Sequence, residues 1–123
     1  AGLEAIVGVQ RDPVLGPMVV VGAGGVLVEL LDDAVVLAPP FSRDELLQAL
    51  AGTRFGRLLE GFRGTRPDRE AFLAACVAVG ELALHEDLLE SLDINPLIVL
   101  EQGVCAVDAK LFLAEPATTT DPG

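Results

Sequence analysis

The chain has 123 residues, 51% of them hydrophobic, and its 19 acidic and 8 basic residues give a formal net charge of −11. This length and apolar content suffice for one domain with a buried core, which excludes a disordered tail and a disulfide-built miniprotein. The acidic balance excludes a nucleic-acid binder held by charge, because phosphate backbones are repelled. We therefore expect an anionic nucleotide to bind only through a metal ion or local amide groups.

The sequence shows neither a membrane-spanning segment nor a secretory signal. The longest near-apolar run covers residues 18–28, about half of what a spanning helix needs. Cys76 and Cys105 lack metal-type spacing and are expected to be buried free thiols in a reducing compartment. These features predict a cytoplasmic protein without a membrane partner. Because the chain lacks an initiator methionine and starts in a predicted strand, we expect a fragment of a longer chain.

The first third is predicted to form an antiparallel meander. Strand-like runs separated by Gly, Pro and Asp turn signals cover residues 4–9, 18–21, 26–31 and 34–38. The glycine-rich loop at 22–25 joins two of these runs as a tight hairpin. A strand rather than a helix follows this loop, so it fits neither a P-loop nor a Rossmann phosphate site.

The middle third is predicted to be helical. Ser42 and Glu45 have the spacing of a capping box at the start of a first helix. A short turn is expected over residues 56–60, and Pro67 then opens a longer helix that reaches about His85. Apolar residues at helical spacing indicate that this helix faces the core. A lone histidine near a helix C-terminus is explained by the helix dipole, so we expect no catalytic role for it.

The last third is predicted to be a β-hairpin with strands over residues 89–100 and 104–113. Residues 114–123 have little to bury and are expected to be a flexible tail, so the domain is expected to occupy residues 1–113. The pattern as a whole predicts the α+β class. It consists of an antiparallel sheet of four to six strands with the helices packed on one face.

This hairpin carries a candidate metal site. Because side chains alternate along a strand, Asp93, Asn95 and Leu97 are predicted to share one side. A two-residue loop at positions 102–103 would place Asp108 opposite Leu97 and diagonal to Asn95, with the backbones about 7 Å apart. An amide and a carboxylate oxygen at that separation are suited to share a Mg²⁺ ion, which completes its shell with water and substrate phosphates.

The same residues also fit the solvated side of a half-buried hairpin. In that interpretation Lys110 forms an ordinary ion pair with Asp93 or Asp108 and no site exists. Pro96 removes one donor from the strand ladder and could shift the register. The spacing alone leaves both interpretations open.

Short strings occur in one order along nearly the whole chain apart from the tail. They are IVGVQRDP at 6–13, GP at 16–17, GG and VE within 24–29, LAP at 37–39, SRDE at 42–45, GFRG at 61–64, LDINPL at 92–97 and AVDAK at 106–110. In this order they resemble the C-terminal lobe of the ATP-grasp domain in NDP-forming acyl-CoA synthetases, relatives of the succinyl-CoA synthetase β subunit. The two hairpin strings, at their mutual spacing, are the most specific part.

The resemblance implies roles for the hairpin residues. Asn95 and Asp108 match the residues that hold the Mg²⁺ ion of the nucleotide, in agreement with the diagonal arrangement derived above. Asp93 matches a carboxylate that meets the phosphohistidine of a partner domain. That carboxylate is usually a glutamate in the succinyl-CoA synthetase relatives.

The resemblance also implies nucleotide contacts in the first third. Glu4 matches a glutamate that contacts the nucleotide sugar, and Gly24 and Gly25 match glycines near the transferred phosphate. Glu29 matches a nearby acid without an assigned role. The implied cofactor is Mg²⁺ with ATP or ADP.

The resemblance implies that the parent protein is an ADP-forming acid–thiol ligase. Such an enzyme makes acyl-CoA from a carboxylic acid, CoA and ATP through an acyl phosphate and a phosphohistidine. The implied partners are an N-terminal ATP-grasp lobe and CoA-binding domains, in the same chain or a partner subunit, so the isolated chain is expected to be inactive. Two alternatives remain open: a non-catalytic nucleotide-sensing domain of a regulatory protein, such as one fused to an acyltransferase, and a structural interaction domain.

Overall fold

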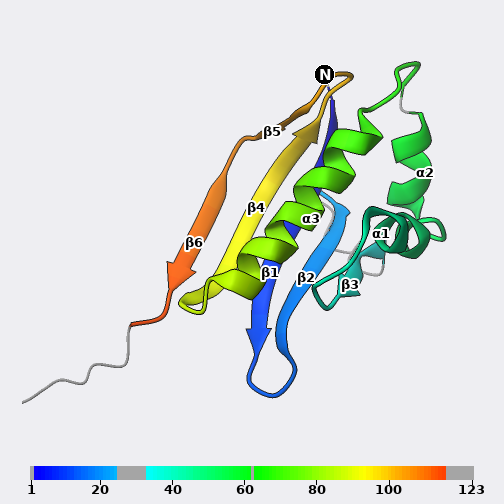
Figure 1. Ribbon diagram of the computed structural model, residues 1–123. Coiled ribbons are helices and arrows are strands. Elements are labelled where there is room, and N and C mark those ends of the chain that lie inside the picture. The colour runs from blue at the N-terminus through cyan, green and yellow to red at the C-terminus, as the bar shows by residue number, and fades with distance from the viewer. Residues whose placement is uncertain (1, 25–32, 62, 116–123) are drawn as a thin grey trace, which may run out of the picture.

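The strands of this chain pair antiparallel into one sheet. The computed structural model describes residues 2–24, 33–61 and 63–115. The strands in these ranges are β1 (Leu3–Asp12), β2 (Gly16–Ala23), β3 (Val35–Leu37), β4 (Leu89–Val99), β5 (Val104–Ala106) and β6 (Ala109–Leu113). Their order is β3-β2-β1-β4-β5, and β6 continues the outer edge beside β4 (Figure 1). The predicted α+β sheet of four to six strands is confirmed.

The meander of the first third is confirmed for the strands that the structure describes. The strand predicted over 26–31 lies outside the described residues. β1 runs beyond the predicted 4–9, because Arg11 and Asp12 still pair with β2. The carboxylate of Asp12 then accepts the N–H groups of Val14 and Leu15 at 2.7 and 2.8 Å, which closes the turn.

All three described helices begin at a capping side chain, and the first two follow each other closely in the chain. These helices are α1 (Arg43–Leu50) and α2 (Arg54–Glu60). The predicted capping box of α1 is confirmed, since Ser42 and Glu45 each accept the other's backbone N–H. The prediction of a mere turn over 56–60 is wrong. Thr53 and the distant Asp33 accept the first N–H groups of α2, and these bonds allow a full helix to form there.

The long helix α3 (Arg69–His85) packs across the sheet. Its N-cap is Asp68, so it starts two residues after the predicted Pro67. Phe72 of α3 is fully buried and meets Phe55 of α2, with ring centroids 5.4 Å apart. Figure 1 shows the helices on one face of the sheet, as predicted. The described helices include none that is long and apolar enough to cross a membrane.

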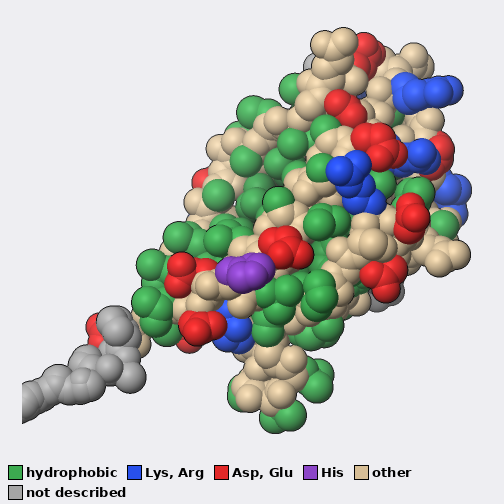
Figure 2. All heavy atoms as spheres, viewed as in Figure 1, with side chains coloured by type: hydrophobic (Ala, Val, Ile, Leu, Met, Phe, Trp, Pro, Cys, Tyr) green, Lys and Arg blue, Asp and Glu red, His purple; other side chains and the backbone are tan. Residues whose placement is uncertain are grey.

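Charge is distributed unevenly over the helical face. Six of the eight basic residues lie between positions 43 and 69. Figure 2 shows them gathered over α1, α2 and the N-terminal end of α3. Arg43 and Arg69 form exposed ion pairs with acids of the same region, such as Arg69 with Glu60 at 2.7 Å. Such exposed pairs contribute little to stability.

The register of the last hairpin differs from the predicted one. Leu100 donates its N–H to the carbonyl of Gly103 at 3.0 Å, so the loop consists of residues 101–102 rather than 102–103. Gly103 has φ +85°, the left-handed conformation that glycine adopts readily at the end of such a turn. Consequently Leu97 pairs with Ala106 and not with Asp108, and Lys110 does not pair with Asn95.

A β-bulge in β4 also changes which of its side chains face the helices, compared with the prediction. Ala5 and Val7 of β1 pair with Leu97 and Ile94, so two residues of β4 stand opposite one residue of β1. Beyond such an extra residue, the side chains of the strand that faced one side of the sheet face the other side. Leu97 is therefore buried, only 4% exposed, whereas Asp93 and Asn95 are exposed, and the prediction that all three share one side is wrong.

The two cysteines differ in environment. Both are free thiols, as expected. Cys76 on α3 is buried, and this burial raises the pKa of its thiol to about 12. Cys105 on the edge strand β5 is exposed, so the prediction that it is buried is wrong. An edge strand leaves one side of its residues without neighbours.

Candidate functional site on the open face of the sheet

The predicted site residues lie on the face of the sheet opposite the helices. Along β1 the buried residues alternate with more exposed ones. Ala5 and Val7 are buried on the helical side, so Glu4, Ile6 and Gly8 project to the other face. Asp93 and Asn95 of the neighbouring strand β4 project to the same face as Glu4, Ile6 and Gly8. This open face brings together residues that are far apart in the sequence.

Asn95 and Asp108 stand directly opposite each other at the outer edge of this face. The N–H of Asn95 donates to the carbonyl of Asp108 at 3.0 Å, and the N–H of Val107 donates to the carbonyl of Pro96, also at 3.0 Å. These two bonds place the backbones of residues 95–96 and 107–108 side by side, although Asp108 lies between β5 and β6 and belongs to neither strand. Both side chains are exposed. The backbones of Asn95 and Asp108 are thus closer than in the predicted diagonal arrangement.

Lys110 does not neutralise this pair. It stands opposite Asp93 in the ladder. In the described part of the chain, the recorded ion pairs include none between Lys110 and either Asp93 or Asp108. The four side chains of the alternative interpretation are exposed, as a solvated hairpin side requires, but neither of its two ion pairs is formed.

Asp93 is left open by a glycine on the neighbouring strand. Gly8 of β1 pairs with Asp93 of β4. A Cβ atom at Gly8 would lie 4.0 Å from the Asp93 Oδ1 atom and 3.3 Å from the carbonyl of Leu92. Because glycine has no side chain, the carboxylate of Asp93 stays accessible from the open face. The sequence analysis predicted no role for Gly8. Its even spacing from Glu4 along β1 indicates that both positions lie on one face of the sheet.

Glu4 and Gly24 meet at the other side of β1. The N–H of Gly24 donates to the carbonyl of Glu4 at 2.9 Å, directly after β2 ends. A Cβ atom at Gly24 would lie 2.8 Å from the carbonyl oxygen of Ala5, so only glycine fits there. The side chain of Glu4 is exposed. Gly25 and Glu29, the other residues predicted for this region, lie outside the described residues.

These positions form one row across the sheet. Ile6 of β1 pairs with Gly22 of β2 and stands opposite the bulge that contains Asn95, which in turn opposes Asp108. With strands about 4.8 Å apart, the row from Gly22 to Asp108 spans roughly 14 Å. Glu4 lies two residues along β1 from this row. The open face therefore offers three acids, an amide and glycine-lined space within the reach of one small polyanionic ligand.

Two residues that sequence reasoning missed hold this face in place. The carboxylate of Asp68 accepts the N–H of Ala71 at 3.1 Å and that of Gly103 at 2.6 Å, and these two bonds lower its pKa. Arg11 donates to three carbonyls at the end of α3 and the start of β4, among them Leu89 at 2.8 Å. An aspartate just before a helix is a recognisable capping signal. The hydrogen-bond partners of Arg11, and Gly103 as a partner of Asp68, are distant in the sequence, so no local sequence pattern indicates these contacts.

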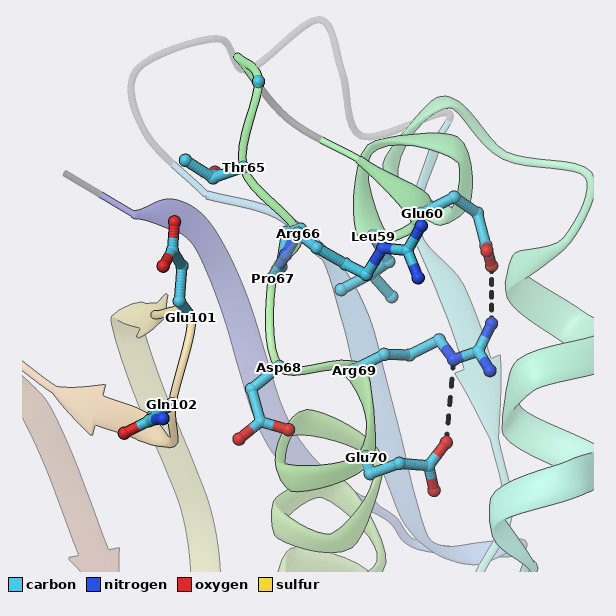
Figure 3. Close-up of a pocket in the computed structure, with 11 residues that line it drawn as sticks. Leu59, Glu60, Thr65, Arg66, Pro67, Asp68, Arg69, Glu70, Glu101 and Gln102 are labelled. Atoms are coloured by element: carbon cyan, nitrogen blue, oxygen red, sulfur yellow. Dashed lines mark hydrogen bonds and ion pairs between the residues drawn. The ribbon is translucent and has the colours of Figure 1, made fainter.

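The cavity at the N-terminal end of α3 is separate from these residues. It has a volume of about 660 Å³ and contains none of the predicted site residues. Figure 3 shows Arg69 between Glu60 and Glu70, to which it is linked by ion pairs of 2.7 and 3.6 Å. Asp68 and Glu101 add further negative charge to the lining. This balance of charge gives no reason to place a nucleotide phosphate there.

Known proteins resemble this chain over nearly its full length. It is 39% identical over 113 residues to the acetate–CoA ligase (ADP-forming) I subunit beta of Pyrococcus furiosus, covering 91% of this chain and 49% of that subunit. It is 40% identical to the acetate–CoA ligase (ADP-forming) I of Archaeoglobus fulgidus, covering 93% of this chain and 17% of that protein. The chain thus spans about half or less of the length of these relatives.

A solved structure has the same fold. The dinucleotide-forming acetyl-coenzyme A synthetase 1 of Ca. Korarchaeum cryptofilum, in complex with coenzyme A and Mg-AMPPCP, superposes with a TM-score of 0.84 at 35% identity. The match covers 92% of this chain and 54% of that one. The ATP-grasp domain family matches residues 1–113. The resemblance seen in the sequence is therefore confirmed, and the chain belongs to the ATP-grasp domain family.

Proposed function

We propose that this chain is the metal-bearing half of the nucleotide site in an ADP-forming acyl-CoA synthetase. The observation that carries the proposal is the direct opposition of Asn95 and Asp108 on the open face of the sheet. Its relatives include ADP-forming acetate–CoA ligases, and the neighbouring structure was solved with Mg-AMPPCP. These similarities support a nucleotide as the ligand of this face.

The chemistry of the donor pair fits Mg²⁺. This ion prefers oxygen ligands and is commonly bound by one or two protein groups, with water and substrate phosphates in its remaining positions. Asn95 and Asp108 would supply an amide oxygen and a carboxylate oxygen. When bound, the ion supplies charge neutralisation at the phosphates, which phosphoryl transfer requires. A chain with a net charge of −11 would otherwise repel ATP.

The other residues of the face would bind and orient the substrate. The exposed carboxylate of Glu4 would accept hydrogen bonds from the hydroxyls of the nucleotide sugar. Gly24 would contribute space rather than a donor, because its N–H is already bonded to the carbonyl of Glu4. Gly25 would lie near the transferred phosphate. Asp93, left open by Gly8, would accept the ring N–H of an incoming histidine and so orient its imidazole for phosphoryl transfer.

The complete reaction requires parts beyond this chain. We infer that the parent protein converts a carboxylic acid, CoA and ATP into acyl-CoA, ADP and phosphate through an acyl phosphate and a phosphohistidine. An N-terminal ATP-grasp lobe and CoA-binding domains would be the partners, in the same chain or another subunit. The isolated chain would then be inactive. Two free cysteines support a reducing, cytoplasmic compartment as part of the same proposal.

Titration of Mg-ADP into the parent protein tests the metal site. Asn95→Ala and Asp108→Ala should each weaken Mg-ADP binding by at least about tenfold, since loss of even an outer-sphere partner of a bound metal costs about 10–100-fold. Asp87→Ala removes another exposed acid, from the loop before β4, and serves as the matched control. Unchanged affinity in both site variants would refute the metal assignment and favour a structural interaction domain.

A second assay separates catalysis from sensing. Formation of ADP by the parent protein should depend on both a carboxylic acid and CoA. If Mg-ADP binds through Asn95 and Asp108 but no such turnover occurs, the chain is part of a nucleotide sensor. Turnover that disappears with either substitution supports the ligase.

A further inference from the structure

The last strand carries the only lysine of this chain. Lys110 lies on β6, opposite Asp93 of β4. Directly opposed residues of two antiparallel strands project to the same face, with Cβ atoms about 4.5–5.5 Å apart. The next pair along the ladder, Leu111 with the buried Leu92, faces the helical side. Because side chains alternate along a strand, Lys110 and Asp93 both project to the open face.

The charge of Lys110 is not used by another residue of the described chain. Among residues 2–24, 33–61 and 63–115, the recorded ion pairs include none of its ammonium. Lys110 and Asp93 are both exposed, and exposed pairs gain too little to hold two flexible side chains together. The carboxylate and the ammonium are therefore available to a ligand as an acceptor and a donor.

Lys110 is also the one cation that the described strands direct to the open face. Arg11, the other basic residue on β1 to β6, donates to three backbone carbonyls around the end of α3. The remaining six basic residues lie between positions 43 and 69. An anionic ligand on the open face would otherwise meet the carboxylates of Glu4 and Asp93, which repel it.

The surroundings of this pair leave room for a flat ring. Gly8 of β1 pairs with Asp93 on the side away from Lys110, and it has no side chain. With strands about 4.8 Å apart, the row from Gly8 to Lys110 spans roughly 10 Å. Asn95 lies two residues from Asp93 along β4, roughly 6.6 Å away, and its N–H donates to the carbonyl of Asp108. The Asp93–Lys110 pair therefore adjoins the candidate metal pair.

An acceptor and a cation in one row favour a ligand that carries both a donor and a negative charge. A phosphohistidine has these two groups at opposite ends of its ring, an N–H on one nitrogen and a phosphoryl group on the other. The carboxylate of Asp93 would repel a plain phosphate, and the ammonium of Lys110 would repel a ring with only a positive charge. Charge-assisted hydrogen bonds to both ends of the ring would fix its orientation.

We propose that Lys110 binds the phosphoryl group of the phosphohistidine and holds it beside Asn95 and Asp108 for transfer to ADP. This inference rests on the proposed function, which supplies the phosphohistidine and assigns its ring N–H to Asp93. The ammonium of Lys110 stabilises the negative charge on the phosphoryl oxygens during the transfer.

The transfer itself needs no further reactant. The bond between phosphorus and the ring nitrogen breaks, and its electron pair stays on that nitrogen. A terminal β-phosphate oxygen of ADP forms the new bond to phosphorus, which gives ATP. The ring proton remains on the other nitrogen, where Asp93 accepts it in a hydrogen bond, so the histidine is left as a neutral imidazole.

Rapid-quench kinetics of the full parent protein tests the role of Lys110. The phosphohistidine is loaded from acetyl-CoA and labelled phosphate, and its reaction with saturating Mg-ADP is followed as labelled ATP. Lys110→Met removes the charge and should slow this transfer by at least about tenfold, because loss of one preorganised donor commonly costs about 100-fold or more. Lys110→Arg keeps a charged donor and should recover most of the rate. Mg-ADP affinity should stay within about twofold in both variants.

A matched control and a second measurement exclude a merely structural effect. Arg57→Met removes an exposed positive charge from α2 and should leave the transfer rate unchanged. A lysine on an edge strand also discourages pairing with other chains. If Lys110 had only that purpose, Lys110→Met would self-associate in sedimentation experiments and keep the wild-type rate, and this result would overturn the proposal.

The remaining outcomes separate this inference from the proposed function. Phosphohistidine that forms and transfers at the wild-type rate in Lys110→Met would refute the role of Lys110 alone. A matching loss of Mg-ADP affinity would assign Lys110 to the nucleotide, and a loss of rate that Lys110→Arg does not recover would show that charge is not the cause. Either result overturns the proposal. A wild-type parent protein that never forms the phosphohistidine would refute the proposed function, and this inference with it.

Discussion

The carboxylate of Asp68 accepts a hydrogen bond from the N–H of Gly103 at 2.6 Å and so joins the start of α3 to the turn of the last hairpin. The N–H of Asp68 also donates to the carbonyl of Leu100 at 2.7 Å, on the other side of the same turn. The position of this turn determines which residue of the outer edge stands opposite Asn95. Asp68 thus lies far from the open face but supports the register on which the candidate metal pair depends.

Asp68→Ala should therefore loosen the hairpin turn as well as the start of α3. We expect a lower melting temperature of the parent protein and weaker Mg-ADP binding, because the turn loses its anchor. Asp68→Asn retains an acceptor for one N–H and should lie between the two. Differential scanning calorimetry and Mg-ADP titration measure the two effects. Weakened binding with an unchanged melting temperature would contradict a purely positioning role.

The stability of the chain should fall at acidic pH through Asp12 and Asp68. Hydrogen bonds from the N–H groups of Leu15 and Val14 lower the pKa of Asp12, and those from Gly103 and Ala71 lower the pKa of Asp68. A carboxyl group with a lowered folded-state pKa stabilises the fold above its unfolded-state pKa, about 3.9, and loses this contribution as the pH falls through the folded-state value.

Urea denaturation of the parent protein and its Asp12→Asn, Asp68→Asn double variant between pH 2 and pH 7 measures this contribution. The difference in unfolding free energy between the two proteins should be constant near neutral pH and shrink below about pH 4. A difference that stays the same over the whole range would show that neither carboxylate contributes through its charge.

Gly24→Ala should disturb the nucleotide side of the open face. Its new Cβ atom would lie 2.8 Å from the carbonyl oxygen of Ala5, which is backbone and must shift. We expect a lower melting temperature and weaker Mg-ADP binding. Gly52→Ala is the matched control, because no atom lies within 4 Å of its Cβ position, and it should be neutral or stabilise by about 0.4–1 kcal/mol. Equal effects of the two substitutions would contradict the close approach at Gly24.

Asp93→Asn should separate phosphoryl transfer from nucleotide binding. The amide keeps the size of the carboxylate but removes the charge that would orient an imidazole. In the parent protein we expect slower transfer of phosphate from the phosphohistidine to ADP, while Mg-ADP affinity stays within about twofold, since a surface charge change is worth only a few tenths of a kcal/mol. Rapid-quench measurement of the phosphohistidine follows the first quantity. An unchanged rate would remove Asp93 from the reaction.

Local signals were enough to predict much of the architecture. The capping box of Ser42 and Glu45 is formed by residues three apart, and the alternation of β1 is visible in its own sequence. The short strings of the family are also local, and they led to the site residues on both halves of the sheet. Such features depend on contacts within a few residues, which the order of amino acids specifies directly.

The sequence by itself thus determined the class of fold, most helix and strand positions, and the identity of the polar residues on the open face. Only the tertiary structure decided the pairing of the last hairpin, the bulge that turns Leu97 away from Asn95, and the capping of α2 by Asp33. Each of these depends on hydrogen bonds between segments distant in the chain, whose geometry is settled when the sheet and helices pack. The direct opposition of Asn95 and Asp108 is a product of that packing.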